Sequence, residues 1–429
     1  MRTSIINKKG KIYFTLEPDK NDIKHIETLN FSIGNEVAEI DLMGVNISEI
    51  HPDIIGLVTI LLCHPFVGKE LYLPLEVSPH FKDTCNDILT KYKIKSEINI
   101  ELSPKKKIVD GRPGLAFSGG ADSTAALIVM PGNTVPIFMK RIMKEESKYD
   151  SDAALESCKE LDEVGYDIVV VESDLEYIRD PVGFPSDIAN AIPAILLSEH
   201  LKLDSISFGT IMESAYGIGH KLYRNYSDTP HSRFYGAILD AAGLELSLPT
   251  AGISEVGTSI INNKAPLGNI AQSCIRGKWK NPCMRCWKCF RKEFLMAALV
   301  PLNSTPSFLE MMKSREVQKK LSEYPISHEN VITYSMQKID CSEHEYLYPL
   351  KKRLDMNLEL CLLENWYSPS IKLVPKKYMN KIMNKILKYL QPMNASQELD
   401  LENWNRNEFY ESKDAQKNHF NLTSSWQDI

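Results

Sequence analysis

The stretch that decides the fold is Leu115-Ala-Phe-Ser-Gly-Gly-Ala-Asp-Ser-Thr-Ala-Ala-Leu127. A short apolar run ends in Ser118-Gly119-Gly120, and a helix is expected to open at Asp122. The two glycines allow left-handed backbone angles and let a ligand approach without a Cβ in the way. Because the first amides of a helix have no intrahelical partner and carry partial positive charge, this pattern predicts an anion site suited to phosphate. Its expected ligands are Ser118, Gly119, Gly120, Asp122, Ser123 and Thr124.

The glycine turn is not a Walker loop, since no Gly-Lys-Ser/Thr follows at the required spacing. It resembles Ser-Gly-Gly-x-Asp-Ser, the signature of the PP-loop ATP pyrophosphatases. In that family the loop holds the β- and γ-phosphates and leaves the α-phosphate open to attack. The resemblance implies an enzyme that binds ATP with Mg²⁺ and cleaves it to AMP and pyrophosphate, with catalytic contributions from Asp122 and Ser123. The plain alternative is a strand, turn and helix with a capping serine.

A second motif consists of Cys274, Cys283, Cys286 and Cys289, spaced C-x8-C-x2-C-x2-C. Four thiolates close in sequence suit the tetrahedral coordination that zinc prefers. Disulfides and an iron–sulfur cluster are the alternatives, although nothing in the sequence indicates an oxidising compartment. The basic residues expected to offset the charge of the thiolates are Arg285, Lys288, Arg291 and Lys292. The remaining cysteines, expected to be ordinary thiols, are Cys63, Cys85, Cys158, Cys341 and Cys361.

Together, the glycine turn and the cysteine spacing resemble the 7-cyano-7-deazaguanine synthases over about residues 110–297. Those enzymes use ATP to activate the carboxylate of 7-carboxy-7-deazaguanine for attack by ammonia, and their zinc is structural. The segment from Tyr226 to Phe234 resembles the substrate loop of the family. Arg224 and Arg233 are candidates to hold a substrate carboxylate, because guanidinium groups bind carboxylates bidentately. Arg233 is therefore the third expected catalytic residue.

The sequence departs from that family pattern at three places. Ser186 and Asp187 stand where the family has a turn arginine, Lys140-Arg141-Ile142 replaces a Tyr-Gly-Gln segment, and His231 interrupts the substrate loop. Besides a metabolic enzyme that joins a small carboxylic acid to an amine, two alternative functions therefore stay open. One is a paralogue that attaches a deazaguanine-like group to a protein or other macromolecule, as in an antiviral system. The other is a sensor or scaffold that binds ATP without turnover.

Composition and charge favour a protein that acts on small molecules. The chain has 429 residues, 43% hydrophobic and 25% charged, as is usual for soluble globular proteins. With 50 basic and 56 acidic residues the net charge is −6, so no basic field indicates nucleic-acid binding, and a carboxylate substrate and an amine donor are the expected partners. No signal-peptide core and no apolar run of about 20 residues is found, which predicts a cytoplasmic location without membrane contact. A homo-oligomer or a partner protein is compatible with these features.

Alternating strand and helix patterns predict an α/β fold whose parallel sheet carries helices on both faces. The expected strands of this PP-loop sheet are 114–118, 134–139, 167–172 and 205–209. Ligands of such sheets lie beyond the carboxyl ends of the strands. Residues expected there are Ser118, Met139, Lys140, Ser173, Asp174 and Thr210. By the family resemblance, backbone groups around Phe138 and Met139 contact the adenine.

The chain is expected to have four parts. These are an N-terminal α+β module at 1–108, a PP-loop ATP-binding domain with the four-cysteine site at 109–298, a helical C-terminal region at 299–392 and a partly disordered tail at 393–429. Residues 376–390 have an apolar stripe at helical spacing and five lysines. Such a helix can bind a membrane or nucleic acid, but packing on its own domain is the favoured interpretation.

Overall fold

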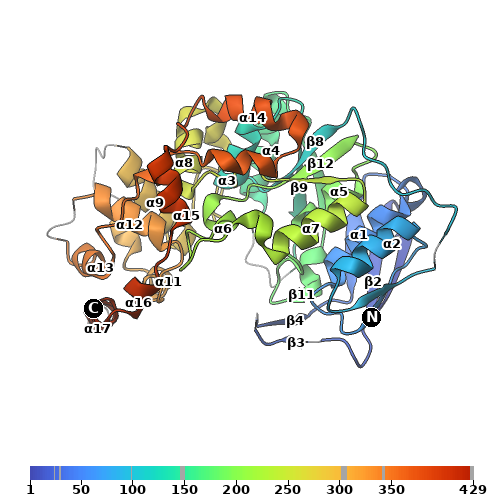
Figure 1. Ribbon diagram of the computed structural model, residues 1–429, viewed down its shortest axis with the longest axis horizontal. Helices are drawn as coiled ribbons and strands as arrows, with labels where there is room; N and C mark the ends of the chain where they lie inside the picture. Colours follow the sequence, from blue (N-terminus) through green and yellow to red (C-terminus); the bar gives the residue numbers. More distant parts are fainter. Residues whose placement is uncertain are drawn as a thin grey trace.

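The computed structural model describes residues 1–23, 25–28, 30–97, 99–144, 150–300, 307–340 and 344–425. Its centre is a ten-stranded mixed sheet with the order β13-β12-β8-β9-β10-β5-β2-β1-β6-β7 (Figure 1). The first half of this sheet consists of β8 (Arg112–Phe117), β9 (Val135–Arg141), β10 (Val169–Ser173), β12 (Leu203–Ser207) and β13 (Glu245–Ser247). All four pairings within this half are parallel. The α/β prediction is confirmed, but the sheet as a whole is mixed and not parallel.

Helices cover both faces of the parallel half. The crossovers contain α3 (Ala121–Val129), α4 (Asp152–Glu163), α5 (Ile192–Leu196) and α7 (Pro230–Ala241). Alternate side chains of β8 point to opposite faces, so Leu115 and Phe117 pack with α3 and α4, while Ala116 belongs to the core on the other side. Because β8 lies between β12 and β9, the chain that leaves its carboxyl end emerges at the middle of this half of the sheet.

The second half of the sheet comes from the N-terminal segment. Its strands are β1 (Arg2–Lys8), β2 (Lys11–Glu17), β5 (Val37–Asp41), β6 (Glu70–Tyr72) and β7 (Lys93–Lys95). A two-residue turn at Lys9 and Gly10, both with positive φ, joins β1 to β2 as an antiparallel hairpin. The two halves meet where β5 pairs antiparallel with β10, through Ser173 and Ile40. A small second sheet of β3 (His25–Ile26), β4 (Phe31–Ile33) and β11 (Arg179–Asp180) also joins the two segments.

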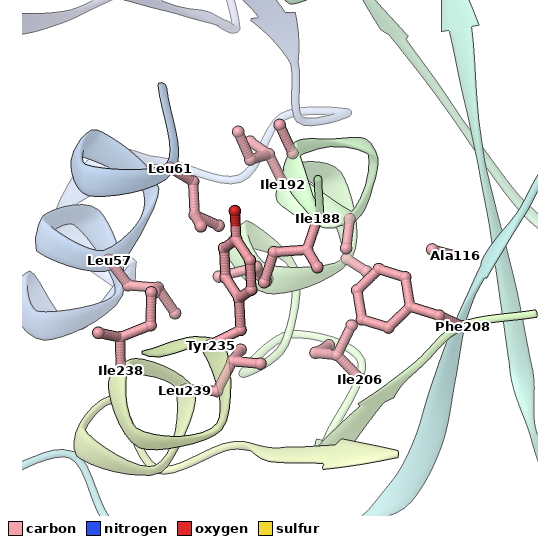
Figure 2. Packing of buried hydrophobic residues seen from close by; sticks show 14 of the residues in the cluster. Leu57, Leu61, Ala116, Ile188, Ile192, Ile206, Phe208, Tyr235, Ile238 and Leu239 are labelled. Atoms are coloured by element: carbon pink, nitrogen blue, oxygen red, sulfur yellow. The ribbon is translucent and has the colours of Figure 1, made fainter. Parts of the chain in front are cut away.

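The N-terminal helices share one hydrophobic core with the parallel half of the sheet. Helix α1 (Pro52–Cys63) packs against α5 and α7, and α2 (Pro79–Ile88) packs against α7. Figure 2 shows Leu61 of α1 beside Tyr235 of α7, with Phe208 from the end of β12 on the sheet side. Residues 1–108, expected to form a separate module, therefore continue both the sheet and the core of residues 109–298.

The C-terminal region is helical, as expected, and builds a second core. Its helices are α9 (Trp287–Leu299), α10 (Ser307–Met311), α11 (Arg315–Leu321), α12 (Glu329–Lys338) and α13 (Leu347–Arg353), which follow α6 (Met212–Ala215) and α8 (Glu255–Lys264). The stripe expected at 376–390 forms a 3-10 turn and α14 (Met379–Ile386). Its buried Ile382, Ile386 and Leu390 pack against α3, as the favoured interpretation requires.

The tail is more ordered than expected. It forms α15 (Ala395–Glu402), α16 (Asn407–Glu411) and α17 (Lys413–Ser425), while Trp426 lies outside the described residues. Trp404 is buried, and its indole Nε1 donates a hydrogen bond to the carbonyl of His220 at 3.1 Å. Its own carbonyl accepts from the amide of Tyr223 at 2.8 Å. Among the described residues, no helix combines the length and apolar character needed to cross a membrane.

Candidate functional site

The glycine turn lies at the carboxyl end of β8 and leads directly into α3. Gly119 has a φ of +72°, which favours glycine, and Gly120 caps α3 without a side-chain hydrogen bond. The Ser118 and Ser123 hydroxyls lie 3.0 Å apart, and the Ser123 hydroxyl donates to the Gly120 carbonyl at 3.1 Å. These bonds hold the turn closed on itself, while Gly120 at the start of the helix has no side chain to cap its first amides.

The end of β12 packs tightly against this turn. A Cβ added to Gly209 would lie 2.8 Å from the carbonyl carbon of Asp122 and 2.8 Å from the amide nitrogen of Ser123. Such a contact is shorter than real Cβ contacts, so only glycine fits here without moving the start of α3. The sequence around this turn indicated a strand end but not this contact.

Three cavities border the glycine turn. One of about 250 Å³ is lined by the predicted residues Ser118, Gly120, Phe138 and Met139. A larger one of about 950 Å³ is lined by Asp122, Thr210 and residues after β12. A third, also of about 250 Å³, is lined by Ala121 and carboxamide side chains of α8 and the following segment. The structure thus brings four of the predicted nucleotide residues to one cavity and Asp122 to another, while Ser123 and Thr124 are buried and line none of the three.

The expected catalytic arginine is not in these cavities. Arg233 is exposed on α7 and does not line any of the three. Its neighbour Tyr235 is buried in the core, so the helix turns Arg233 toward solvent. The arginine that does line the large cavity is Arg224, whose Nη2 donates to the Ser214 carbonyl at 3.0 Å. Of the two arginine candidates, the geometry favours Arg224.

Two of the residues expected to contact a ligand at the strand ends form hydrogen bonds to a neighbouring strand instead. The Ser173 hydroxyl donates to the Glu39 carbonyl at 2.8 Å, and the Asp174 carboxylate accepts from the Glu39 amide at 2.6 Å. Both side chains therefore bind β5 across the junction of the two sheet halves. Sequence periodicity does not reveal this junction, because the pairing residues are far apart in the chain.

A buried charged cluster lies behind the glycine turn. The Asp122 Oδ1 accepts from the Thr258 hydroxyl at 3.0 Å and lies 4.0 Å from the Lys292 Nζ. Lys292 in turn lies 2.9 Å from the carboxylate of Glu255, which is fully buried. Arg291 at 2.9 Å and the His328 ring at 3.3 Å are the other partners of Glu255. The cluster connects the turn to α8, α9 and the start of α12.

A second buried carboxylate, Glu213 on α6, joins this cluster. It accepts from the Glu255 amide at 3.1 Å and from the Asn330 side chain at 3.0 Å. Burial, followed by the negative charge of Glu255, raises the pKa of Glu213 to about 7. Burial would also raise the pKa of Glu255, but Lys292, Arg291 and His328 outweigh it and hold that pKa well below its usual range. The cluster therefore contains one carboxyl group that stays ionised and one that titrates near neutral pH.

Replacing Glu213 with glutamine should remove a pH dependence of stability. Because the folded-state pKa is raised, the stability contributed by protonated Glu213 is full below about pH 4.5 and is lost as pH rises through about 7. In this window we expect the free energy of unfolding of the unmodified protein to fall relative to Glu213→Gln by at most about 1.4 kcal/mol per pH unit. Denaturant unfolding at several pH values measures it, with exposed Glu163→Gln as the control. Parallel stability curves would contradict the assignment.

The four predicted cysteines form a cluster that could hold a metal ion such as zinc. Their Sγ atoms all lie within 4.8 Å of one another, and Cys289 Sγ lies 3.5 Å from Cys286 Sγ and 3.8 Å from Cys283 Sγ. Four sulfurs at about 2.3 Å from a tetrahedral zinc would be about 3.8 Å apart. All four are free thiols, so the disulfide alternative is not formed. Cys341 lies outside the described residues.

The cysteine cluster is joined to the glycine turn by the segment before Cys274. The Gln272 amide donates to the Gly119 carbonyl at 2.7 Å, and the Ala121 amide lies 3.4 Å from the Ser273 hydroxyl that accepts from it. At its other end, Cys286 caps α9, with its Sγ accepting from the Cys289 amide at 3.5 Å. The cluster thus lies between the turn and the second core.

Several of these site residues were not indicated by sequence patterns. Gln272 and Ser273 carry no motif, and His328 is distant in sequence from the turn. Glu213 was expected only as a member of a polar, aromatic stretch that also holds Arg224, and its burial beside Glu255 was not predicted. The adjacent cations Arg291 and Lys292, expected to offset the charge of the thiolates, form ion pairs with Glu255 instead. Two neighbouring cations in a largely buried helix are the one sequence signal for a buried anionic partner, because such residues are seldom buried unpaired.

One family model matches part of the chain. It matches residues 234–405, and its description is a family of unknown function (DUF6395). The matched segment includes the cysteine cluster, Glu255 and His328, and does not reach the glycine turn at 118–123. Neither a curated protein nor a solved structure matches the chain.

Proposed function

We propose that the protein is an AMP-forming, ATP-dependent ligase of the PP-loop pyrophosphatase type. In this proposal ATP binds with Mg²⁺, a substrate carboxylate attacks its α-phosphate, and an amine displaces AMP from the resulting acyl-adenylate. The observation that carries the proposal is the position of the glycine turn between two cavities. Ser118 and Gly120 line one with Phe138 and Met139, and Asp122 lines the other.

The turn supplies mainly electrostatic stabilisation in this scheme. A triphosphate held by the amide end of α3 would have its terminal phosphates on the turn and its adenine toward Phe138 and Met139. Donors that already point at the leaving pyrophosphate need little reorganisation during the reaction. The hydroxyls of Ser118, which lines that cavity, and of Ser123, 3.0 Å from it, are the side-chain donors proposed for this role, whereas Thr124 is fully buried. Asp122 orients the turn through Thr258 and would be the carboxylate of the turn that could hold Mg²⁺.

The large cavity is the proposed site of the carboxylic acid. Its volume of about 950 Å³ is at the upper end for small-molecule sites. Arg224 is the guanidinium group in its wall and is proposed to pair with the carboxylate. By the sequence resemblance, the expected acid is 7-carboxy-7-deazaguanine or a relative of it. The zinc held by the four cysteines would be structural and would take no part in the chemistry.

The second candidate function is transfer of the activated acyl group to an amine on a larger molecule. The cavity is lined by His328 of the C-terminal region as well as by residues of the sheet. A cavity of this size, bordered by a region outside the family resemblance, favours an amine carried by a protein or other macromolecule over free ammonia alone. The acyl-adenylate chemistry is the same in both cases.

Product analysis tests the proposal. We expect the purified protein, given ATP, Mg²⁺, 7-carboxy-7-deazaguanine and ammonium, to release AMP and pyrophosphate in equal amounts. Formation of ADP would contradict the AMP-forming assignment. Tight ATP binding without pyrophosphate across a panel of carboxylic acids would instead support a nucleotide sensor. A covalent adduct on a co-expressed protein, seen by mass spectrometry, would identify the macromolecular acceptor.

A further inference from the structure

Three polar side chains lie in a row in the wall of the large cavity. Tyr226 comes from a 3-10 turn at Tyr226–Asp228, His231 from the first turn of α7, and Asp187 from the segment before α5. The Tyr226 hydroxyl lies 3.0 Å from Nδ1 of His231. The Nε2 of the same ring lies 3.5 Å from the Asp187 carboxylate. Each nitrogen of the His231 imidazole thus has one of the other two side chains beside it.

The row runs from the protein interior to solvent. Tyr226 is 5% exposed, while the side chains of His231 and Asp187 are 36% and 77% exposed. The ring of His231 is also held by Tyr235, whose centroid lies 4.5 Å away in an edge-to-face contact. The Tyr235 hydroxyl accepts from the Asp187 amide at 3.3 Å, which positions the carboxylate as well. These contacts position the row from the buried side.

Local sequence explains how the row is built. Thr229 caps α7 and Pro230 follows at the first helical position, so the helix begins at a defined residue. His231 then falls in the first turn, one helical turn before the buried Tyr235. His231 and Asp187 are two of the positions at which the sequence departs from the family pattern, and they pair with each other.

The second half of the proposed reaction, the attack of the amine, needs a group that accepts a proton. When the nitrogen lone pair of an amine attacks the acyl carbon, the bond from that carbon to the AMP oxygen breaks and AMP leaves as an anion. The new amide nitrogen must then lose one proton. A hydroxyl hydrogen-bonded to a neutral imidazole can take this proton while passing its own to the ring, and a nearby carboxylate stabilises the imidazolium that forms.

We propose that Tyr226, His231 and Asp187 form a proton relay that acts as the general base for amine attack on the acyl-adenylate. This inference rests on the proposed function and assigns its second step. The Tyr226 oxygen receives the amine proton, its own proton moves to Nδ1 of His231, and the resulting imidazolium, stabilised by Asp187, releases its Nε2 proton to water. One proton leaves the cavity for each amide bond formed.

The charges around the row favour the protonation states that the relay requires. Burial lowers the pKa of His231, Asp187 opposes this, and Arg224 adds to the lowering. Burial raises the pKa of Tyr226, as do Tyr235 and Asp187. At neutral pH the imidazole is therefore neutral and the phenol keeps its proton, so the hydroxyl donates to Nδ1 and the Nε2–H group faces the Asp187 carboxylate at 3.5 Å.

Separate assays of the two half-reactions test the relay. Pyrophosphate exchange into ATP, driven by 7-carboxy-7-deazaguanine, reports adenylation, and amide formation with ammonium reports amine attack. We expect His231→Ala to lower amide formation about 100-fold while exchange persists. Tyr226→Phe, which keeps the ring, should act in the same direction, and exposed His200→Ala should change neither rate. Hydroxylamine, largely unprotonated at neutral pH, should restore most of the product formation in His231→Ala.

Three outcomes of these assays would contradict the relay, and each has a different meaning. If exchange and amide formation fall together in His231→Ala and Tyr226→Phe, the row has a structural role and the relay is wrong. An unchanged rate of amide formation in both variants also contradicts it. If the unmodified protein shows no acid-dependent exchange at all, the proposed function itself fails, and the relay fails with it.

Discussion

Replacing Asp122 and Ser123 together with alanine is expected to lower the rate of AMP formation about a thousand-fold or more. Ser123 links Ser118 to the Gly120 carbonyl within the turn. Asp122 ties the first turn of α3 to Thr258 and lies at the edge of the large cavity. The double change removes one phosphate donor and releases the turn from its support. ATP affinity measured by calorimetry and AMP released per enzyme measure the effect.

Two comparisons make this experiment specific. Asp83→Ala, on the exposed face of α2, removes one carboxylate far from the turn and should leave ATP affinity and AMP formation unchanged. Gly209→Ala should weaken ATP binding without removing any donor, because its Cβ would collide with Asp122 and Ser123. If the double variant binds and turns over ATP as the unmodified protein does, the turn is not the phosphate site.

Removal of the metal is expected to have the largest effect on stability. Cys286→Ser, or prolonged chelation, should release one zinc per chain and lower the free energy of unfolding by several kcal/mol, since structural zinc binding contributes directly to folding. The second core includes Cys274, Cys286 and Cys289 together with Phe290 and Phe294, so its helices should melt first. Metal analysis and thermal unfolding followed by circular dichroism measure this.

The same experiment should weaken nucleotide binding. The segment that carries Cys274 holds the glycine turn through Gln272 and Ser273, and loss of the metal frees that segment. Cys361→Ser is the matched control, because this thiol is exposed and lies outside the cluster. Iron and acid-labile sulfide in the purified protein would mean that the site holds an iron–sulfur cluster. An unchanged melting temperature after complete metal removal would contradict a structural role.

The parts of the fold that depend on local signals were predictable from the sequence. The four expected strands correspond to β8, β9, β10 and β12 within a few residues, because each is a short apolar run bounded by turn formers. The cysteine cluster was predictable for the same reason, since three of its ligands lie within one short segment. The glycine turn and its helix follow from a stretch of about ten residues.

The parts that depend on contacts between distant residues were not predictable. The join of β5 to β10 rests on Ser173 and Ile40, which no local pattern connects. Strand β13 is only Glu245–Ser247, too short for a periodicity to appear. Arg233 and Arg224 look equivalent in sequence and both are exposed, but only Arg224 lines the large cavity. The tail was expected to be partly disordered because it is polar, with Trp404 and other aromatic residues suggesting partial docking; Trp404 does dock on the residues after α6, but the sequence does not identify its partners His220 and Tyr223.

An isotope experiment tests the central claim, that the turn holds a triphosphate so that a carboxylate can attack the α-phosphorus. In the reaction described above, the acid is supplied with ¹⁸O in its carboxylate and the nucleotide products are analysed by mass spectrometry. Attack by the carboxylate predicts one ¹⁸O atom in AMP and none in pyrophosphate. AMP without label, or label-free ADP as the product, would contradict the account.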